Sequence, residues 1–181
     1  MTQLTFLSAF LWVLLQVPPI FLTDQGQVSF RSEAPLETIE ASSNTLRGAV
    51  NTEDRNFAFV LNMNAFRGFN DPLQREHFCE KFLECGKFPE STFSGKFIEK
   101  LDFSQMGKRE VRAKGTFSIH GVERERIIRG TMDIRPDGIR IVAGFSVKLA
   151  DHNIKIPLVV HQNVAEEIQV RIDMLLTPKA G

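Results

Sequence analysis

The residue types that most often carry catalysis or metal binding are few in this chain and widely spaced. The four histidines are His77, His120, His152 and His161, and no two of them have the H-x-x-x-H spacing that places two imidazoles on one helix face. Their carboxylate neighbours follow no metal-binding template. We therefore expect no metal site. His77 should have a packing or helix-surface role, and His120 should hydrogen-bond to the turn that ends its strand.

Nucleophiles and phosphate-binding loops are equally unsupported. Ser118 and Ser146 do not lie in a G-x-S-x-G motif, which in hydrolases exposes a serine on a sharp strand-to-helix turn. Neither GxGxxG nor GxxxxGK[ST] occurs in the chain, so no glycine-rich loop is indicated for a nucleotide. The sequence therefore predicts no catalytic residues and no cofactor.

The two cysteines could form a disulfide or remain free. Cys79 and Cys85 are six positions apart, which on a regular helix separates their side chains by about 240°. A disulfide would therefore require the helix to break between them. We expect two free, partly buried thiols, with the disulfide as the alternative. Because no C-x-x-C is present, the sequence indicates neither a redox motif nor a zinc site.

The distribution of charge separates an N-terminal leader from the rest of the chain. The 22 basic and 22 acidic residues balance, and no basic half suggests a nucleic-acid partner. Residues 1–23 carry no charged side chain and include the apolar run FLSAFLWVLL, which is typical of a secretory signal. Pro18 and Pro19 favour a signal peptide over the alternative, an uncleaved membrane anchor. We expect a single domain over residues 24–181, periplasmic or secreted, although no A-x-A cleavage site precedes Asp24.

Two runs of charge alternate in sign along predicted strands. They are Lys108 to Arg112 and Arg124 to Arg126. A solvent-exposed strand face explains both runs. The alternative is a transient contact with lipid head groups or a membrane surface.

The elements that position these residues are mostly strands. From Gln27 onward, apolar and polar residues alternate with a period of two, as an antiparallel sheet with one solvated face requires. About nine segments show this pattern, enough to close a barrel. They are residues 28–31, 38–42, 46–51, 57–64, 93–101, 111–119, 126–134, 139–149 and 168–176.

The turns between these segments have suitable residues. Arg135-Pro136-Asp137-Gly138 combines a proline, which fixes φ, with a permissive glycine, so it predicts a hairpin. His120-Gly121 predicts a second turn. Both indicate that consecutive strands pair with each other.

One helix is predicted inside the β pattern. Asp71 is placed as its N-cap, Pro72 at its first position and Gln74 at the capping-box position. Gly86 is a candidate for the residue that ends it. A second, shorter helix is predicted over residues 163–167.

One face of the predicted helix is apolar. Phe78 and Phe82, with Leu73, have the spacing of a single helix face. We expect this face to pack the helix onto the barrel. The alternative is a lid over a cavity mouth.

Several stretches resemble one known family. SFRSEAPLETIEA, REHF with KFPESTFSGKF, GTFSIHGVERE, and VKLADHNIKIPLVV with AEEIQV occur in this order. Together they resemble the YceI-like family of secreted lipid-binding β-barrels, from about Gly26 to Pro178. The resemblance implies a mainly β fold: an extended antiparallel, lipocalin-like barrel of about eight strands with one or two short helices. It also implies sequestration of an isoprenoid quinone or polyprenyl lipid. Cys79 and Cys85 depart from the family, in which polar residues are more typical there.

The aromatic composition fits an apolar interior. The chain has 16 Phe, no Tyr and one Trp, Trp12, which lies in the leader. Phenyl rings bring apolar area without a polar group. Gly95, Gly115, Gly130 and Ala143 alternate with large inward residues, which suggests space for a ligand; the alternative is that these glycines bend strands. The predicted ligand-binding residues are Phe59, Phe97, Gly115, Phe117, Met132, Ile141, Ala143 and Phe145.

The sequence thus predicts a non-catalytic, secreted or periplasmic protein that encloses a hydrophobic or amphiphilic lipid. Two alternatives remain open. One is an enzyme acting on a bound lipid, which would need at least two ionisable groups facing inward. The other is an interaction or stress-response domain with a solid core.

Overall fold

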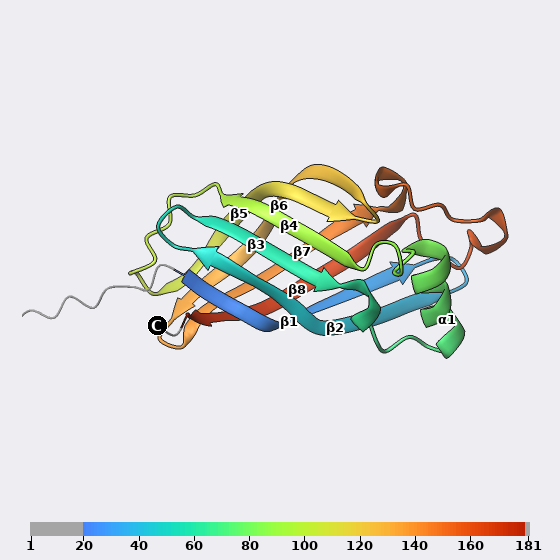
Figure 1. Ribbon diagram of the computed structural model, residues 1–181, viewed down its shortest axis with the longest axis horizontal. Helices are drawn as coiled ribbons and strands as arrows, with labels where there is room; N and C mark the ends of the chain where they lie inside the picture. The colour runs from blue at the N-terminus through green and yellow to red at the C-terminus, as the bar shows by residue number, and fades with distance from the viewer. Residues whose placement is uncertain (1–19, 180–181) are drawn as a thin grey trace, which may run out of the picture.

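A computed structural model describes residues 20–179 of the chain, which form an eight-stranded antiparallel barrel with a short helical segment at one end (Figure 1). The strands are β1 (Ile20–Glu33), β2 (Thr38–Asn51), β3 (Asn56–Asn62), β4 (Glu90–Phe97), β5 (Gly107–Ile119), β6 (Val122–Arg135), β7 (Gly138–Lys148) and β8 (Glu167–Pro178). The helical elements are η1 (Met63–Ala65), α1 (Pro72–His77), η2 (Phe78–Phe82), η3 (Leu149–His152) and η4 (Leu158–Val160).

The barrel follows the simplest strand order. Each strand pairs antiparallel with the next, and β8 returns to pair with β1, for example Phe30 with Val170. Closure gives every strand two partners, so no sheet edge is left to pair with another chain. The predicted mainly β barrel is confirmed. Among residues 20–179, no helix is long and apolar enough to cross a membrane.

The predicted strands differ from the structure in their number and in where the barrel begins. Residues 38–42 and 46–51 belong to one strand, β2, because Ser43 and Thr45 form an irregularity rather than a turn: Thr45 N donates to Ser43 Oγ at 3.3 Å while the pairing with β1 shifts. The nine predicted segments thus become eight strands. The barrel also begins at Ile20, earlier than the predicted boundary at residue 24. Residues 1–19 of the predicted leader lie outside the described residues.

The helix begins as predicted but ends differently. Asp71 accepts a hydrogen bond from Gln74 N at 2.9 Å, which confirms the N-cap. After His77 the chain continues as a π-helical turn, in which Leu83 N donates to Phe78 O at 2.9 Å. Glu84, with φ 45°, reverses the chain in place of Gly86. The predicted helix at 163–167 is wrong, since the nearby helical turn is η4.

Both predicted turns are present. Ile119 pairs with Val122 across His120 and Gly121, whose φ angles of 54° and 70° are those of the hairpin turn that matches strand twist. Arg135 pairs with Gly138 across Pro136 and Asp137.

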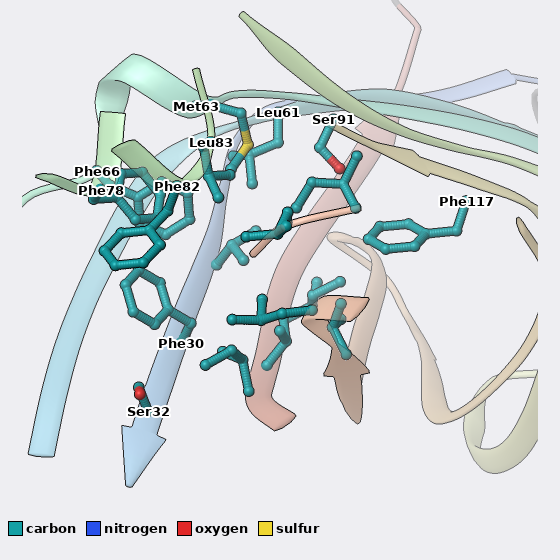
Figure 2. A pocket seen from close by; sticks show the side chains of 18 of the residues that line it. Phe30, Ser32, Leu61, Met63, Phe66, Phe78, Phe82, Leu83, Ser91 and Phe117 are labelled. Carbon is teal, nitrogen blue, oxygen red and sulfur yellow. The ribbon is translucent and has the colours of Figure 1, made fainter. Parts of the chain in front are cut away.

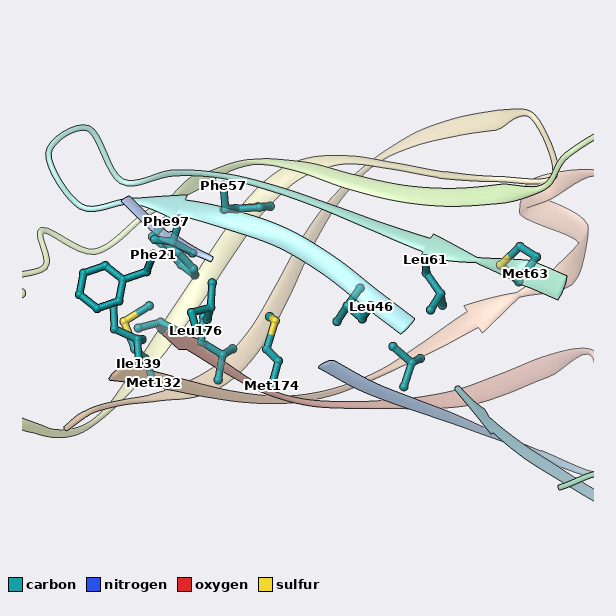
Figure 3. Close-up of a cluster of buried hydrophobic side chains, with 14 of the residues drawn as sticks. Phe21, Leu46, Phe57, Leu61, Met63, Phe97, Met132, Ile139, Met174 and Leu176 are labelled. Atoms are coloured by element: carbon teal, nitrogen blue, oxygen red, sulfur yellow. The ribbon is translucent and has the colours of Figure 1, made fainter. Parts of the chain in front are cut away.

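The interior has two halves. The half near α1 contains the aromatic side chains of Figure 2, and the half near the two ends of the described chain contains the side chains around Met132 and Leu176 in Figure 3. Val50, Met132, Ile139 and Leu176 in this second half are 0–1% exposed. None of these four residues lines the pocket described below.

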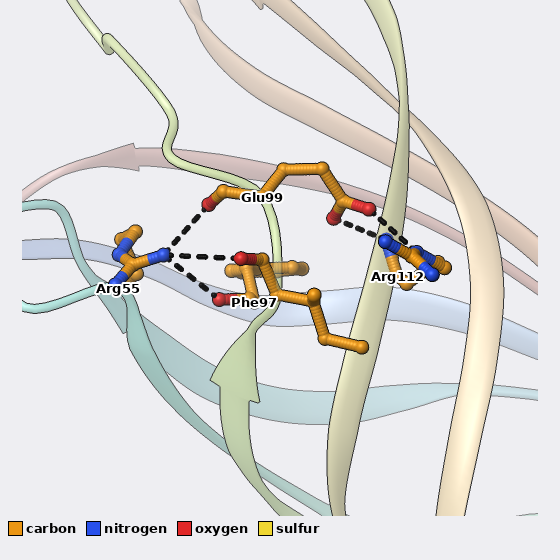
Figure 4. A network of polar contacts seen from close by, with 5 residues as sticks. Arg55, Phe97, Glu99 and Arg112 are labelled. Atoms are coloured by element: carbon orange, nitrogen blue, oxygen red, sulfur yellow. Dashed lines mark hydrogen bonds and ion pairs between the residues drawn. The ribbon is translucent and has the colours of Figure 1, made fainter.

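A polar network attaches the segment after β4 to the barrel wall (Figure 4). Arg55 Nη1 donates to the carbonyl oxygens of Phe97, Ile98 and Glu99 at 3.4, 3.3 and 2.9 Å. The Glu99 carboxylate accepts from the backbone N and Nε of Arg112, both at 2.7 Å. Burial raises the pKa of Glu99, but the hydrogen bonds from Arg112 outweigh it and leave this pKa below its ordinary value.

Six charged residues of β5, β6 and β7 face outward, as the alternation predicts. Arg112, Lys114, Arg129, Arg140 and Lys148 are exposed, and Asp133 is half-buried. Arg140 pairs with Asp173 of β8 through two hydrogen bonds of 2.9 and 2.7 Å, and these lower the pKa of the Asp173 carboxyl.

Candidate functional site

An apolar pocket occupies the half of the barrel near α1. It contains about 1260 Å³ free of protein atoms, including the part open to solvent. All eight strands and η2 contribute to its wall. The apolar lining comprises Val28, Phe30, Ile39, Leu46, Phe59, Leu61, Met63, Phe66, Phe69, Phe78, Phe82, Leu83, Phe93, Phe117, Ile119, Ile128, Phe145, Val147, Leu149, Ile154, Val164, Ile168, Val170, Ile172 and Met174.

Aromatic rings form the part of the wall under the helix. Phe30 of β1 stacks on Phe78 with ring centroids 5.4 Å apart and planes 6° from parallel. Phe66 and Phe69, from the segment between η1 and α1, contact Phe78 at 5.4 and 5.2 Å. In Figure 2 this cluster and Phe82 lie across the pocket from Phe117. The predicted apolar helix face therefore both packs the helix onto the barrel and lines the pocket, whereas Leu73 is 56% exposed.

Three of the four polar residues of the lining, all but Thr92, have side chains that hydrogen-bond to protein groups. Ser32 Oγ accepts from Ala165 N at 2.9 Å, and Ser91 Oγ donates to Ser118 O at 2.8 Å. Gln74 accepts from Asn70 N at 3.0 Å and donates to Glu37. A polar ligand would find few free partners in this wall, and burying it without them is costly. A hydrocarbon chain carries no such cost.

The predicted ligand-binding residues divide between the two halves of the barrel. Phe59, Phe117 and Phe145 line the pocket. Phe97, Met132 and Ile141 belong to the buried cluster outside the lining. Gly115 and Ala143 lie outside the lining as well.

The small residues do not leave space for a ligand. A Cβ added at Gly95 would lie 2.1 Å from Lys114 O, and one at Gly115 would lie 2.2 Å from Ser94 O. At Gly130 the nearest atom, Val142 O, would be 2.7 Å away. These glycines are required because neighbouring strand backbones occupy the position of a side chain. The interpretation of them as space for a ligand is therefore wrong.

Much of the wall was missed by the sequence prediction. Ile168, Val170 and Ile172 of β8 line the pocket together with Phe30 of β1. The alternation of residues 168–176 shows that these side chains share one face. Their position beside Phe30 depends on the β1–β8 pairing, which no local pattern reveals.

A buried histidine lies behind the pocket wall. His152 is 0% exposed, and its ring contacts Phe117 edge-on with centroids 5.4 Å apart. Its Nδ1 donates to Val122 O at 3.1 Å, and its Nε2 has no hydrogen-bond partner among the described residues. Burial lowers the pKa of His152, against the opposing effect of the Val122 carbonyl, and Arg126 and Arg124 lower it further.

The burial of His152 makes stability depend on pH. Because its folded-state pKa lies below the unfolded value of about 6.5, the unfolded chain binds more protons near that pH. The His152 contribution is therefore complete above about pH 6.5 and falls as the pH drops below it, with a slope of at most about 1.4 kcal/mol per pH unit. Urea unfolding at a series of pH values measures this loss. A His152→Gln variant should lose less stability over the same window, and equal slopes would contradict the assignment.

The cysteines form a disulfide, which corrects the expectation of free thiols. Cys79 and Cys85 are bonded, with Cα atoms 4.9 Å apart. The 240° separation does not apply because the helix is regular only to His77. The π-helical turn and the reversal at Glu84 bring the two residues together, and Cys85 N donates to Cys79 O at 2.8 Å.

The disulfide loop, residues 79–85, is attached to the barrel through Glu84, next to Cys85. The Oε2 atom of Glu84 is 2.7 Å from His120 Nε2, and His120 Nδ1 donates to His152 O at 3.0 Å. The prediction that His120 hydrogen-bonds to its own turn is therefore wrong. Leu83, beside Glu84, lines the pocket, so the loop forms part of the pocket wall.

Removal of the disulfide should destabilise this wall. Closing so short a loop contributes about 2 kcal/mol in the chain-entropy estimate, so a Cys79→Ser/Cys85→Ser variant should melt roughly 4–8 °C lower. Thermal unfolding followed by circular dichroism, with and without reductant, measures the shift. The reductant should lower the melting temperature of the wild type alone. A wild type insensitive to complete reduction would contradict the prediction.

The described part of the chain holds no cluster of three or more His, Cys, Asp or Glu side chains that could bind a metal ion. The pocket lining likewise contains no ionisable side chain. Within residues 20–179, then, the arrangement offers a hydrophobic enclosure rather than a set of reactive groups.

Comparison with known proteins identifies the family. A family model described as the YceI-like domain matches residues 21–176. No curated protein matches the sequence.

Solved structures share the fold at low sequence identity. A polyisoprenoid-binding domain from Saccharophagus degradans, implicated in plant cell wall breakdown, superposes with a TM-score of 0.73 at 13% identity, covering 90% of this chain and 99% of that one. Burkholderia cenocepacia BcnA gives 0.65 at 12% identity, with coverages of 84% and 96%. The Campylobacter jejuni YCEI protein gives 0.56 at 14% identity, with both chains covered in full. The match of the family model over nearly all of the described barrel shows that this chain belongs to the YceI-like domain family.

Proposed function

We propose that this protein binds a long-chain amphiphile, such as an isoprenoid quinone or a polyprenyl lipid, and encloses its tail without altering it. The observation that carries the proposal is a pocket with an almost wholly apolar wall, in which Ser32, Gln74 and Ser91 are already hydrogen-bonded to protein groups. The Saccharophagus degradans structure with the same fold is described as polyisoprenoid-binding, which is consistent with this ligand class.

The energetics favour a long tail. Each buried CH₂ contributes roughly 0.8 kcal/mol, so ten carbons offer about 8 kcal/mol before the cost of association, which is several kcal/mol. Tight binding therefore depends on chain length and not on hydrogen bonds. The polar head group would remain at the solvent-exposed mouth.

Two observations distinguish the proposal from its alternatives. An enzyme acting on the tail would need ionisable side chains in the wall, and the lining drawn from residues 20–179 has none. A domain with a solid core would be filled throughout, whereas the half of this barrel near α1 holds a pocket of about 1260 Å³, including the part open to solvent.

Extraction of the protein purified without detergent tests the proposal. We expect organic solvent to release a lipid in roughly equimolar amount, identified by mass spectrometry. Recovery of a chemically altered lipid after incubation would support an enzyme. Neither copurified lipid nor binding of an added polyprenyl alcohol would favour the solid-cored alternative.

We also propose that the protein is exported. The proposal rests on the uncharged residues 1–23. Because Ile20 pairs with Asn51 and Phe21 with Val50 at the start of β1, cleavage after residue 23 would remove barrel residues, so we expect the cut before Ile20. Cell fractionation and the intact mass of the mature protein test this, and a purely cytoplasmic protein would refute it.

A transient membrane contact would bring the pocket to its ligand. Leu36, Leu73, Leu158 and Val159 are 56–89% exposed and belong to the β1–β2 turn, α1 and the connection before β8, which lie at one end of the barrel (Figure 1). Glu37 joins these segments by accepting from Gln74 and from Asn163 Nδ2, the latter at 3.3 Å. Aliphatic side chains around a cavity mouth suit insertion into a lipid surface.

Vesicle flotation tests this contact. We expect Leu158→Asp/Val159→Asp to reduce flotation with phosphatidylcholine vesicles severalfold, because two carboxylates would replace the exposed aliphatic groups. Met106→Asp is the control, since Met106 is 66% exposed but lies in the β4–β5 connection at the other end. Equal flotation of both variants would remove membrane contact from the proposal.

A further inference from the structure

The pocket ends at the same level on every strand. On β1, β2, β3 and β8 the deepest lining residues are Val28, Leu46, Phe59 and Met174. The next inward-facing side chains on β2, β3 and β8, those of Val50, Phe57 and Leu176, belong to the packed cluster and are 0–4% exposed. The pocket therefore has a floor midway along the barrel.

Small residues mark this level on the other side of the barrel. Gly95 pairs with Gly115 on β4 and β5, and Gly130 pairs with Ala143 on β6 and β7. Each of these lies two positions away from the deepest lining residue of its strand, on the side of the packed half. The strands approach so closely here that Gly95 and Gly115 could not carry even a Cβ. The small residues thus close the cavity.

Two flexible side chains complete the floor. A Cβ placed on Gly26 of β1 would lie 3.0 Å from Met174 Cβ and 3.2 Å from Leu46 Cβ. Met174 and Leu46 therefore flank the position where β1 has no side chain. In Figure 3 they lie between the packed cluster around Met132 and Leu176 and the open half with Leu61 and Met63.

We propose that Met174 and Leu46 set the maximum length of the lipid tail that the pocket accepts. This inference rests on the proposed function. A tail that enters from the α1 end extends along the apolar wall until its terminus meets these side chains. Additional carbons then remain outside the pocket and add nothing to affinity. The floor selects ligands by tail length.

A homologous series of n-alkyl alcohols is the probe. Each methylene that becomes buried should raise affinity about fourfold, until the terminus reaches the floor and affinity stops rising. Calorimetric titration of the wild type gives the chain length of this break. In Met174→Ala the break should move to chains longer by about two methylenes, because a flexible side chain of that length is removed.

Met132→Ala is the matched control. Met132 is 0% exposed and outside the pocket lining, so the same substitution disturbs the packed half without shortening the floor. Its break should coincide with that of the wild type. Circular dichroism melting establishes that each variant is folded. Leu46→Val provides a milder second variant that should move the break in the same direction.

The outcomes separate the inference from the function on which it rests. A break that stays fixed in both Met174→Ala and Leu46→Val, while affinity still rises with length below it, overturns the floor assignment alone. Failure of the wild type to bind any alcohol of the series overturns the proposed function as well. A break that moves equally in Met132→Ala also overturns the assignment, because a general loosening of the core would then explain it.

Discussion

Replacement of Val170 by tryptophan should weaken binding of a polyprenyl alcohol about fifty-fold while the barrel stays folded. Val170 lies near the start of β8, pairs with Phe30 of β1 and Phe145 of β7, and lines the pocket. An indole there would occupy space that the tail needs. If it excludes three methylenes, the loss is about 2.4 kcal/mol, or roughly fifty-fold in Kd. Because the indole enters an existing cavity, we expect little strain.

Val142→Trp is the matched control. Val142 lies on β7, pairs with Asp173 of β8 and is not part of the pocket lining. The same change of side chain should therefore leave binding near the wild-type value. Calorimetric titration gives both affinities, and thermal melting confirms that both variants are folded. Equal binding by Val170→Trp and the wild type would show that the tail lies elsewhere.

Substitution of Gly115 by alanine adds a single methyl group, and it should be among the most destabilising substitutions of this size in the protein. Its Cβ would lie 2.2 Å from Ser94 O and 3.0 Å from Gly95 Cα, and both atoms belong to backbone that cannot move without breaking the β4–β5 pairing. We expect a loss of about 3 kcal/mol, which corresponds to a fall in melting temperature of roughly 6–12 °C.

Gly144→Ala provides the comparison. At Gly144, on β7, an added Cβ would meet only Val170 O, at 3.9 Å. Since alanine is more favourable than glycine within a strand by roughly 0.5–1 kcal/mol, this variant should be as stable as the wild type or slightly more so. Urea unfolding of both variants measures the difference. Similar stabilities for the two alanines would show that the strands at Gly115 can separate at little cost.

The strands could be predicted because one face of each is exposed to solvent, so that apolar and polar residues alternate along the chain. Ile168, Val170, Ile172 and Met174 alternate with polar residues, and all four face the interior. The same alternation cannot show how far along the barrel the interior is hollow. Phe117 lines the pocket and Phe97 packs in the closed half, although both are inward phenylalanines of adjacent strands. What separates them is their level along the barrel, which depends on register.

The disulfide illustrates a second limit. From spacing alone, Cys79 and Cys85 point apart on a regular helix. The structure joins them because one π-helical turn and a left-handed Glu84 replace the expected helix end. Neither feature has a reliable local signature, since glutamate adopts a positive φ only where its surroundings enforce it. Here the bond itself and the contact between Glu84 and His120 provide that enforcement.

The pairing of β1 with β8 also constrains how the protein folds. Phe21 meets Pro178 at one end of this seam, and Arg31 meets Gln169 at the other. β1 therefore acquires its second neighbour only after β8, the last strand of the barrel, has been synthesised. Contacts so distant in sequence slow folding. A chain that lacks β8 cannot close the barrel. A barrel built this way remains open until β8 has been synthesised and has paired with β1.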